Sequence, residues 1–87
     1  MEGNCYICGV WAKLEKHHVY GGQRRSISEK YGAVVWLCHN CHNEPPDGVH
    51  FNKDFDNELK QIGQKAAMQT YGWSIDDFRR EFGKSYL

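Results

Sequence analysis

Two short stretches decide the fold of this chain, Cys5-Tyr6-Ile7-Cys8 and Cys38-His39-Asn40-Cys41-His42. In each stretch, two residues separate a pair of cysteines, which is the spacing found in structural zinc sites, and four thiolates fill the tetrahedral shell of one zinc ion. The 29 residues between the two pairs must therefore leave this site and return to it. We predict a structural Zn²⁺ ion bound by four ligands: Cys5, Cys8, Cys38 and Cys41.

The length and composition of the chain are those of one small domain. With 87 residues, 40% of them apolar, the chain buries a limited core, so a bound metal would add stability that the core lacks. No apolar run approaches the ~20 residues that span a bilayer, and the first residues lack the pattern of a secretory signal peptide. We therefore expect a cytoplasmic protein whose reduced cysteines bind zinc, rather than a secreted domain with two disulfides.

Apolar periodicity and turn residues predict the elements between the cysteine pairs. Loose alternation over residues 14–20 predicts a strand that ends at a glycine turn, and residues 34–37 have the pattern of a short buried strand. Between these strands, Ser26 and Glu29 have the spacing of a capping box, which predicts a short helix near residues 27–31. The second strand then leads back to the second cysteine pair.

Two further helices are predicted after the second cysteine pair. Residues 53–71 place apolar side chains at helical spacing, with Asn52 as the N-cap and Gly72 as the stop. Ser74 and Asp77 form a second capping box at the start of the last helix. The first of these helices is expected to be a packing helix, and Tyr86 and Leu87 are expected to fold back as an apolar anchor.

Three histidines are the candidates for chemistry. His17 and His18 are adjacent on the predicted strand, so their side chains should point to opposite faces and have different roles. Hydrolysis of a phosphodiester requires a base that activates water and a cation that neutralises charge on the phosphate and the leaving oxygen. An imidazole with an ordinary pKa of ~6.5 accepts a proton from water near neutral pH. We therefore assign the base to His18 and the divalent ion to His17 and His42.

The role of His50 is open on the residues alone. It follows a turn that contains two prolines, and it could return to the same ion as a third ligand, contact phosphate, or cap the helix that follows. Imidazole suits several transition metals as a ligand. We place His50 among the ligands of the divalent ion.

The net charge of zero argues against a nucleic-acid partner, but the charges are unevenly distributed. Between Lys13 and Lys30 five basic residues accompany two acidic ones, whereas between Glu44 and Glu58 five acidic residues accompany one basic residue. The basic segment follows the histidine pair, where a phosphate backbone would have to lie. A solvated loop with scattered charges is the alternative. We predict that DNA is held by Arg24, Arg25 and Lys30.

The cysteine pairs, the histidine pair and the sequence Leu37-Cys38-x-x-Cys41-His42 together resemble one family, the HNH endonucleases. Stretches such as His17-His18-Val19-Tyr20-Gly21-Gly22 are similar to small HNH proteins encoded by bacteriophages and prophages. The resemblance implies an α+β fold in a single domain, residues 1–87. A zinc-bound treble-clef or ββα-metal core would occupy residues 5–52, and two C-terminal helices would occupy residues 53–87.

The resemblance also implies roles for individual residues. In that family the residue before the catalytic histidine binds a divalent ion, the next histidine is the general base, and the histidine after the last cysteine is the other metal ligand. These positions are His17, His18 and His42. One position departs from the family, because Ala33 stands where the family has its middle asparagine, which holds the loop that aims the base.

The same resemblance implies a biological setting. The substrate would be DNA, the ion Mg²⁺, Mn²⁺ or Ni²⁺, and the products would carry 5′-phosphate and 3′-hydroxyl ends. The protein would process phage or prophage DNA in the cytoplasm of a bacterial host cell, and a homodimer or a larger phage complex is compatible with that role. No association with a membrane is expected.

Two other hypotheses remain open on the sequence. The chain could be a zinc-bound module that binds nucleic acid or protein and is catalytically weak or inactive, which Ala33 and the zero net charge favour. It could also be a structural subunit of a phage assembly that docks through its C-terminal helices. DNA binding without cleavage would indicate the module, and oligomerisation without DNA binding would indicate the subunit.

Overall fold

Short strands pair in two separate antiparallel sheets. In the computed structural model, which describes residues 1–46 and 48–87, β1 (Glu2–Asn4) pairs with β2 (Trp11–Lys13), and β3 (Glu15–His18) pairs with β4 (Val34–Leu37). The helical elements are, in chain order, η1 (Gly22–Arg24), α1 (Arg25–Tyr31), α2 (His39–Asn43), η2 (Val49–Phe51), α3 (Lys53–Tyr71) and α4 (Ile75–Phe82). The predicted α+β class is confirmed.

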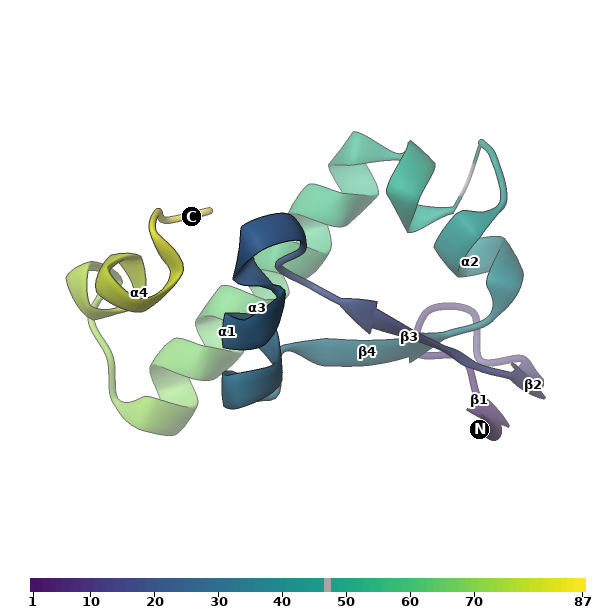
Figure 1. Cartoon of the computed structure of the whole chain (residues 1–87), viewed down its shortest axis with the longest axis horizontal. Coiled ribbons are helices and arrows are strands. Elements are labelled where there is room, and N and C mark those ends of the chain that lie inside the picture. The colour runs from purple at the N-terminus through teal and green to yellow at the C-terminus, as the bar shows by residue number, and fades with distance from the viewer. Residues whose placement is uncertain (47) are drawn as a thin grey trace.

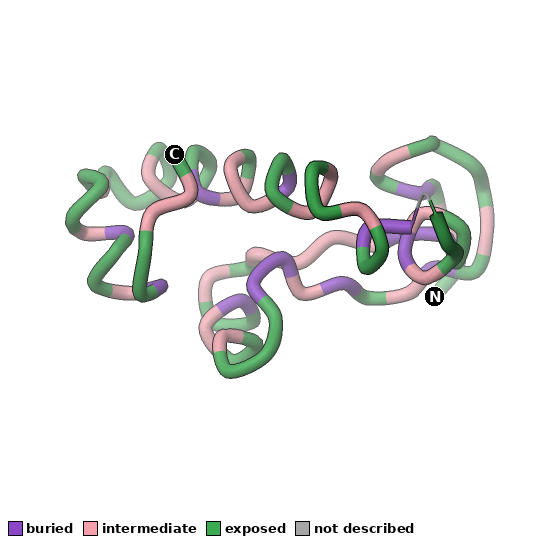
Figure 2. Tube along the Cα trace, turned by 90° about the horizontal axis from the view of Figure 1, so that it is seen from above, coloured by how far each residue is buried: buried purple, intermediate pink, exposed green. Residues whose placement is uncertain are grey.

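The fold is elongated, with extents of 36 × 23 × 20 Å. The β1–β2 pair lies at one end and α4 with the C-terminus lies at the other, and α3 runs between these ends (Figure 1). Most of α3 is exposed or half-buried, as Figure 2 shows, and only Leu59 and Gln64 of this helix are buried. The core therefore lies along one side of α3.

The β3–β4 pair carries the histidine pair. In its register His17 lies opposite Val35, and His18 lies opposite Val34. His17 is buried and His18 is half-buried, because side chains alternate between the two faces of a strand. The predicted strand is confirmed, although its ladder is shorter than residues 14–20.

The helix α1 begins differently from the prediction. The expected capping box of Ser26 and Glu29 is wrong, because α1 starts at Arg25 and has no side-chain cap at its N-terminus. The 3-10 helix η1 runs directly into α1, and its backbone bonds already occupy the first N–H groups, including that of Arg24 on Gly21 (3.1 Å). Ser26 thus lies inside the helix rather than at its start.

The two C-terminal helices have the predicted caps. Asn52 accepts a hydrogen bond from the backbone N–H of Phe55 at 3.1 Å, and α3 ends at Gly72 in the left-handed conformation. Ser74 and Asp77 form the expected capping box of α4. Because each cap satisfies backbone groups that a helix end leaves free, these local signals alone suffice to place both helices.

An aromatic core joins the C-terminal helices to the loop after β3. The buried ring of Tyr20 lies 4.7 Å from that of Phe82 and 5.2 Å from that of Tyr86, and its hydroxyl donates to the carbonyl of Lys60 at 2.6 Å. Buried Gln64 accepts from the backbone N–H of Tyr86 at 2.7 Å. The C-terminal residues therefore fold back onto α3 and cover Tyr20.

Across the residues that the structure describes, no helix has the length and apolar character that crossing a bilayer requires.

We predict that Gly63→Ala destabilises the protein. Alanine is the better helix former by ~1 kcal/mol, but a Cβ at position 63 would lie 2.9 Å from the hydroxyl oxygen of buried Tyr20. Overpacking of a rigid core costs ~1–3 kcal/mol and outweighs the gain in propensity. Urea unfolding of the zinc-loaded protein measures the change. The control is Thr70→Ala on the exposed side of α3, which gains propensity without a clash. If Gly63→Ala were as stable as this control, the side chain of Tyr20 would have to move aside without cost, and the prediction would be wrong.

Candidate metal centres

The first candidate centre is the group of four cysteines. Cys5 follows β1 and Cys8 lies in the turn before β2, where the N–H of Gly9 donates to the carbonyl of Cys5 at 3.0 Å. Gly9 has a φ of 78°, which favours glycine. Cys38 follows β4 and precedes α2, and Cys41 lies in α2. The turn and the strand end thus bring two distant cysteine pairs together.

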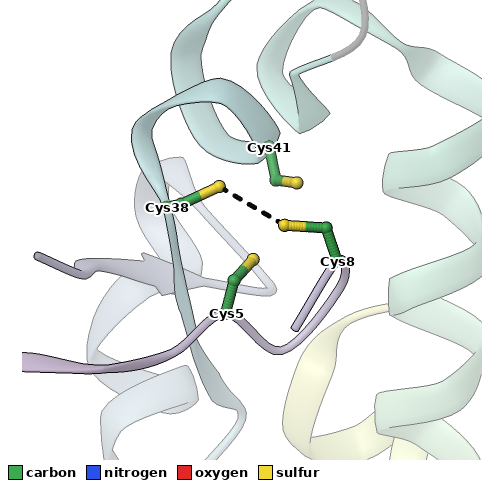
Figure 3. A group of neighbouring side chains, drawn as sticks. All are labelled: Cys5, Cys8, Cys38 and Cys41. Atoms are coloured by element: carbon green, nitrogen blue, oxygen red, sulfur yellow. Dashed lines mark hydrogen bonds between the residues drawn. The ribbon is translucent and has the colours of Figure 1, made fainter. Parts of the chain in front are cut away.

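The geometry of the four sulfur atoms fits a tetrahedral metal ion. All four Sγ atoms lie within 4.8 Å of one another, and the four thiols point toward a common centre (Figure 3). The Sγ atoms of Cys8 and Cys38 are 3.8 Å apart. Two sulfurs bound at ~2.3 Å to one tetrahedral zinc lie ~3.8 Å apart, whereas a disulfide requires ~2.05 Å. The predicted four-cysteine cluster is therefore present, and it suits a metal such as zinc.

The electrostatics of the cluster depend on a cation. Burial opposes ionisation of Cys5, but the backbone N–H groups around it outweigh burial and lower its pKa to about 6. Burial and the neighbouring thiols raise the pKa of Cys41. The thiolate of Cys5 therefore forms more readily than that of Cys41, and a bound cation would favour the ionised form of its cysteine ligands.

The second candidate centre is formed by three imidazoles. His17 of β3, His42 of α2 and His50 of η2 each offer a nitrogen within 4.8 Å of the other two. Their ring centroids are 5.1 Å, 5.0 Å and 4.6 Å apart, and the Nε2 atoms of His42 and His50 are 2.9 Å apart. Two nitrogens bound at ~2.1 Å to one ion at a right angle lie ~3.0 Å apart, so this spacing fits the octahedral geometry of several divalent ions.

The state of His17 gives an independent test of this second centre. Its Nε2 is the one buried side-chain polar atom without a hydrogen-bond partner among the described residues. Burial, followed by repulsion from His42 and His50, lowers the pKa of His17 to about 4, so the ring is neutral and presents a free lone pair. An unpaired buried polar atom costs ~1–3 kcal/mol, and a metal–nitrogen bond would remove that cost. The residues present therefore fit a divalent ion.

Glu15 orients His42 by contacting the Nδ1 side of its imidazole ring. The Nδ1–H of His42 donates to Oε1 of Glu15 at 2.8 Å, and the amide of Asn43 donates to the same oxygen at 3.0 Å. Because a carboxylate only accepts, the proton of His42 must lie on Nδ1, which leaves the Nε2 lone pair facing His17 and His50. Glu15 itself has a pKa below its usual range, because its carboxylate is hydrogen-bonded first to His42 and then to His39.

The signal for Glu15 was present in the sequence. Residues two apart on a strand share a face, so Glu15 and His17 point to the same side of β3. The sequence prediction did not include Glu15, because its partner His42 lies 27 residues away. His39, which the prediction left outside the site, is exposed and contacts Glu15 and Glu44.

His18 lies outside the three-imidazole group but at the same hollow. Its Nε2 is 3.6 Å from Oε1 of Glu29. The hollow has a volume of about 280 Å³ and lies beside the histidines and the first turns of α3; its lining includes His17, His18, His50, Lys53, Asp56 and Lys60. The half-buried ring of His18 therefore borders the same space as His17 and His50.

The predicted DNA-contacting residues have unequal surroundings. The Nε of Arg24 donates to the carbonyl of Phe82 at the end of α4, so this guanidinium holds α4 against the loop after β3. Arg25 and Lys30 are exposed on α1. Lys53 and Lys60 line the hollow and were missing from the sequence prediction; Lys53 belongs to the acidic segment between Glu44 and Glu58.

Comparisons with known proteins give no match: no protein-family model, no curated protein and no solved structure is similar to this chain. The function must therefore be inferred from the two centres themselves.

We predict that Cys38→Ser unfolds the N-terminal half. Serine cannot replace a thiolate ligand of zinc, and a structural zinc site contributes folding energy directly. Metal analysis should show at least one zinc per chain in the parent protein and loss of that zinc in the variant, together with a loss of circular dichroism. His42→Ala is the control and should keep the cysteine-bound zinc. Native dichroism in zinc-free Cys38→Ser would contradict the prediction.

We further predict that Glu15→Gln weakens binding at the three imidazoles. The amide cannot accept from His42 as strongly as the carboxylate, and loss of such an outer partner lowers metal affinity ~10–100-fold. Titration of the zinc-loaded protein with Ni²⁺, followed by calorimetry, measures the affinity. Glu58→Gln on the exposed side of α3 is the matched control, and equal affinities in the two variants would remove Glu15 from this role.

Proposed function

We propose that this chain is a metal-dependent DNA endonuclease of the HNH type. One observation carries the proposal: two members of the three-imidazole group, His17 and His50, border the same hollow as a separate histidine, His18. The order of β3, β4 and α2 beside the four-cysteine cluster supports a ββα-metal core of the kind found in this family. His17, His18 and His42 stand at the positions where the family resemblance expects them.

His18 is assigned as the general base. Its neutral imidazole would take a proton from a water molecule that attacks the scissile phosphorus. Glu29, whose carboxylate oxygen is 3.6 Å from Nε2 of His18, would stabilise the imidazolium that forms, as an acidic neighbour does for a catalytic histidine. Hydrogen-bonded catalytic contacts often tighten only when substrate binds, so this spacing is compatible with the role.

His17, His42 and His50 are assigned as the ligands of a divalent ion such as Mg²⁺, Mn²⁺ or Ni²⁺. When bound, this ion supplies positive charge that stabilises the phosphate and the leaving 3′ oxygen. The chain's own contribution is to keep His17 neutral by burial and His42 oriented through Glu15. Three imidazoles favour transition metals over Mg²⁺, and activity is expected to be higher with Mn²⁺ or Ni²⁺.

Positive side chains around the hollow would hold the phosphate backbone. Lys53 and Lys60 line the hollow, although Lys60 also contacts Asp56 at 2.8 Å. Arg25 and Lys30 are exposed on α1, close in sequence to the loop that borders the hollow. Contacts of this kind are independent of base sequence and sensitive to salt. We propose phage or prophage DNA in a bacterial host cell as the setting.

A second candidate function is a zinc-bound binding module without activity. Two observations favour it: Arg24 is occupied by the carbonyl of Phe82, and β4 and α3 border an apolar groove of about 260 Å³ with exposed Ile62 and Tyr71 on its wall. Exposed apolar surface of this kind suits contact with another protein. Salt-dependent retention of DNA without cleavage under any divalent ion would favour this candidate.

We predict that the purified, zinc-loaded protein nicks plasmid DNA when Mg²⁺, Mn²⁺ or Ni²⁺ is present. Removal of a general base typically lowers the rate ~10²–10⁴-fold, so His18→Ala should lose at least ~10²-fold in nicking rate and keep its melting temperature. Gln69→Ala is the control, because Gln69 is exposed on α3 and lies outside both centres; its rate should be unchanged. Equal nicking by His18→Ala would remove His18 from the base role.

A further inference from the structure

Ser28 of α1 is a polar side chain with no solvent exposure. Its hydroxyl accepts a hydrogen bond from the backbone N–H of Tyr20 at 3.0 Å and donates one to the carbonyl of the same residue at 2.9 Å. A hydroxyl has a single O–H donor. Ser28 uses this donor on the carbonyl of Tyr20 and one of its acceptor positions for the N–H of the same residue. One side chain thus holds both main-chain polar groups of a residue in the loop after β3.

The backbone of Ser28 holds the other side of the same loop. Its carbonyl accepts from the N–H of Ala33 at 2.8 Å, and the carbonyl of Ala33 accepts from the N–H of Val19 at 3.0 Å. The chain after β3 is therefore bound to the start of β4 through Ala33 and to α1 through Ser28. The bond between Val19 and Ala33 lies just past the last pair of the β3–β4 ladder, which is His18 with Val34.

Tyr20, whose backbone Ser28 binds, is also held through its side chain. The hydroxyl of Tyr20 donates to the carbonyl of Lys60, and its ring is packed against Phe82. Tyr20 follows His18 by two residues, so the main chain on the C-terminal side of His18 is held between the aromatic core and α1. Glu29, the residue after Ser28, approaches the ring of His18 itself.

We propose that Ser28 is a positioning residue for His18, an inference that rests on the proposed endonuclease function. By holding the Tyr20 backbone, Ser28 keeps the ring of His18 at the hollow and next to Glu29. In the family that the sequence resembles, an asparagine at the position of Ala33 holds the loop that aims the base. Ala33 has no polar side chain, and Ser28 performs this work from α1. Being fully buried, Ser28 acts through Tyr20 and does not touch DNA.

The position of a base matters more to rate than to binding. A displacement of ~1 Å in a catalytic group can cost ~10²-fold in rate, whereas phosphate contacts on the surface are unaffected. A purely structural role for Ser28 would instead lower overall stability and leave the rate per folded molecule unchanged. The kcat per folded molecule therefore separates the two roles.

The test compares four zinc-loaded proteins: the parent, Ser28→Ala, Ser28→Thr and the control Ser26→Ala, which changes an exposed serine of the same helix. Plasmid nicking with Mn²⁺ gives kcat and KM. Ser28→Ala should lose ~10²-fold in kcat with KM unchanged, Ser28→Thr should recover most of this loss because it keeps the hydroxyl, and Ser26→Ala should match the parent.

A second measurement does not depend on activity. Amide hydrogen exchange should be at least ~10-fold faster at Tyr20 in Ser28→Ala than in the parent, with no change at Val35 of the β3–β4 ladder. The NMR signals of the His18 ring at fixed pH should move in Ser28→Ala and stay in place in Ser26→Ala. Both changes are expected to be local, because the zinc cluster and the aromatic core are intact.

The outcomes separate this inference from the proposed function. A parent that nicks DNA together with a Ser28→Ala variant of unchanged kcat would overturn the positioning role and leave the endonuclease standing. If the parent does not nick DNA, the proposed function fails, and the NMR signals of the His18 ring decide: unmoved signals in Ser28→Ala overturn the inference, and moved signals support it. If Ser28→Ala does not fold, Ser28→Cys replaces it, since a thiol keeps the volume but hydrogen-bonds weakly.

Discussion

The convergence of four sulfur atoms on one point is the constraint on which the rest of this structure depends. The strands β1 and β2 have three residues each, and α2 has five, lengths at which isolated elements are marginal in water. A shared metal ion would join the turn between β1 and β2 to the end of β4 and the start of α2. Because α2 also carries His42, the sulfur cluster determines where one imidazole of the second centre lies.

The second centre combines features that would be unfavourable without a ligand. His17 is buried with a nitrogen that has no hydrogen-bond partner within residues 1–46 and 48–87, and the Nε2 atoms of His42 and His50 are 2.9 Å apart. Glu15 prevents His42 from turning its lone pair away, since its carboxylate accepts the Nδ1 proton. An apolar core of the same size would be simpler to stabilise, and a bound cation would offset the cost of this arrangement.

The C-terminal helices support the loop that follows the histidine pair through two hydrogen bonds. Lys60 of α3 accepts from the hydroxyl of Tyr20, and the carbonyl of Phe82 at the end of α4 accepts from Arg24. Both contacts reach the loop between β3 and α1, which follows the histidine pair. The helices thus support the loop next to His18, while the first turns of α3 form part of the hollow that its ring borders.

The sequence by itself determined the local geometry: the cysteine spacing, the opposite faces of His17 and His18, and the caps of both C-terminal helices all depend on residues a few positions apart. Only the tertiary structure decided which distant groups meet. Glu15 reaches His42, Ser28 holds the loop in place of a side chain at position 33, and Arg24 binds α4 rather than remaining free for DNA. The spacing of residues in the sequence reflects the periodicity of the backbone. A hydrogen-bond partner far along the chain depends on how the elements pack, and no local sequence pattern predicts that packing.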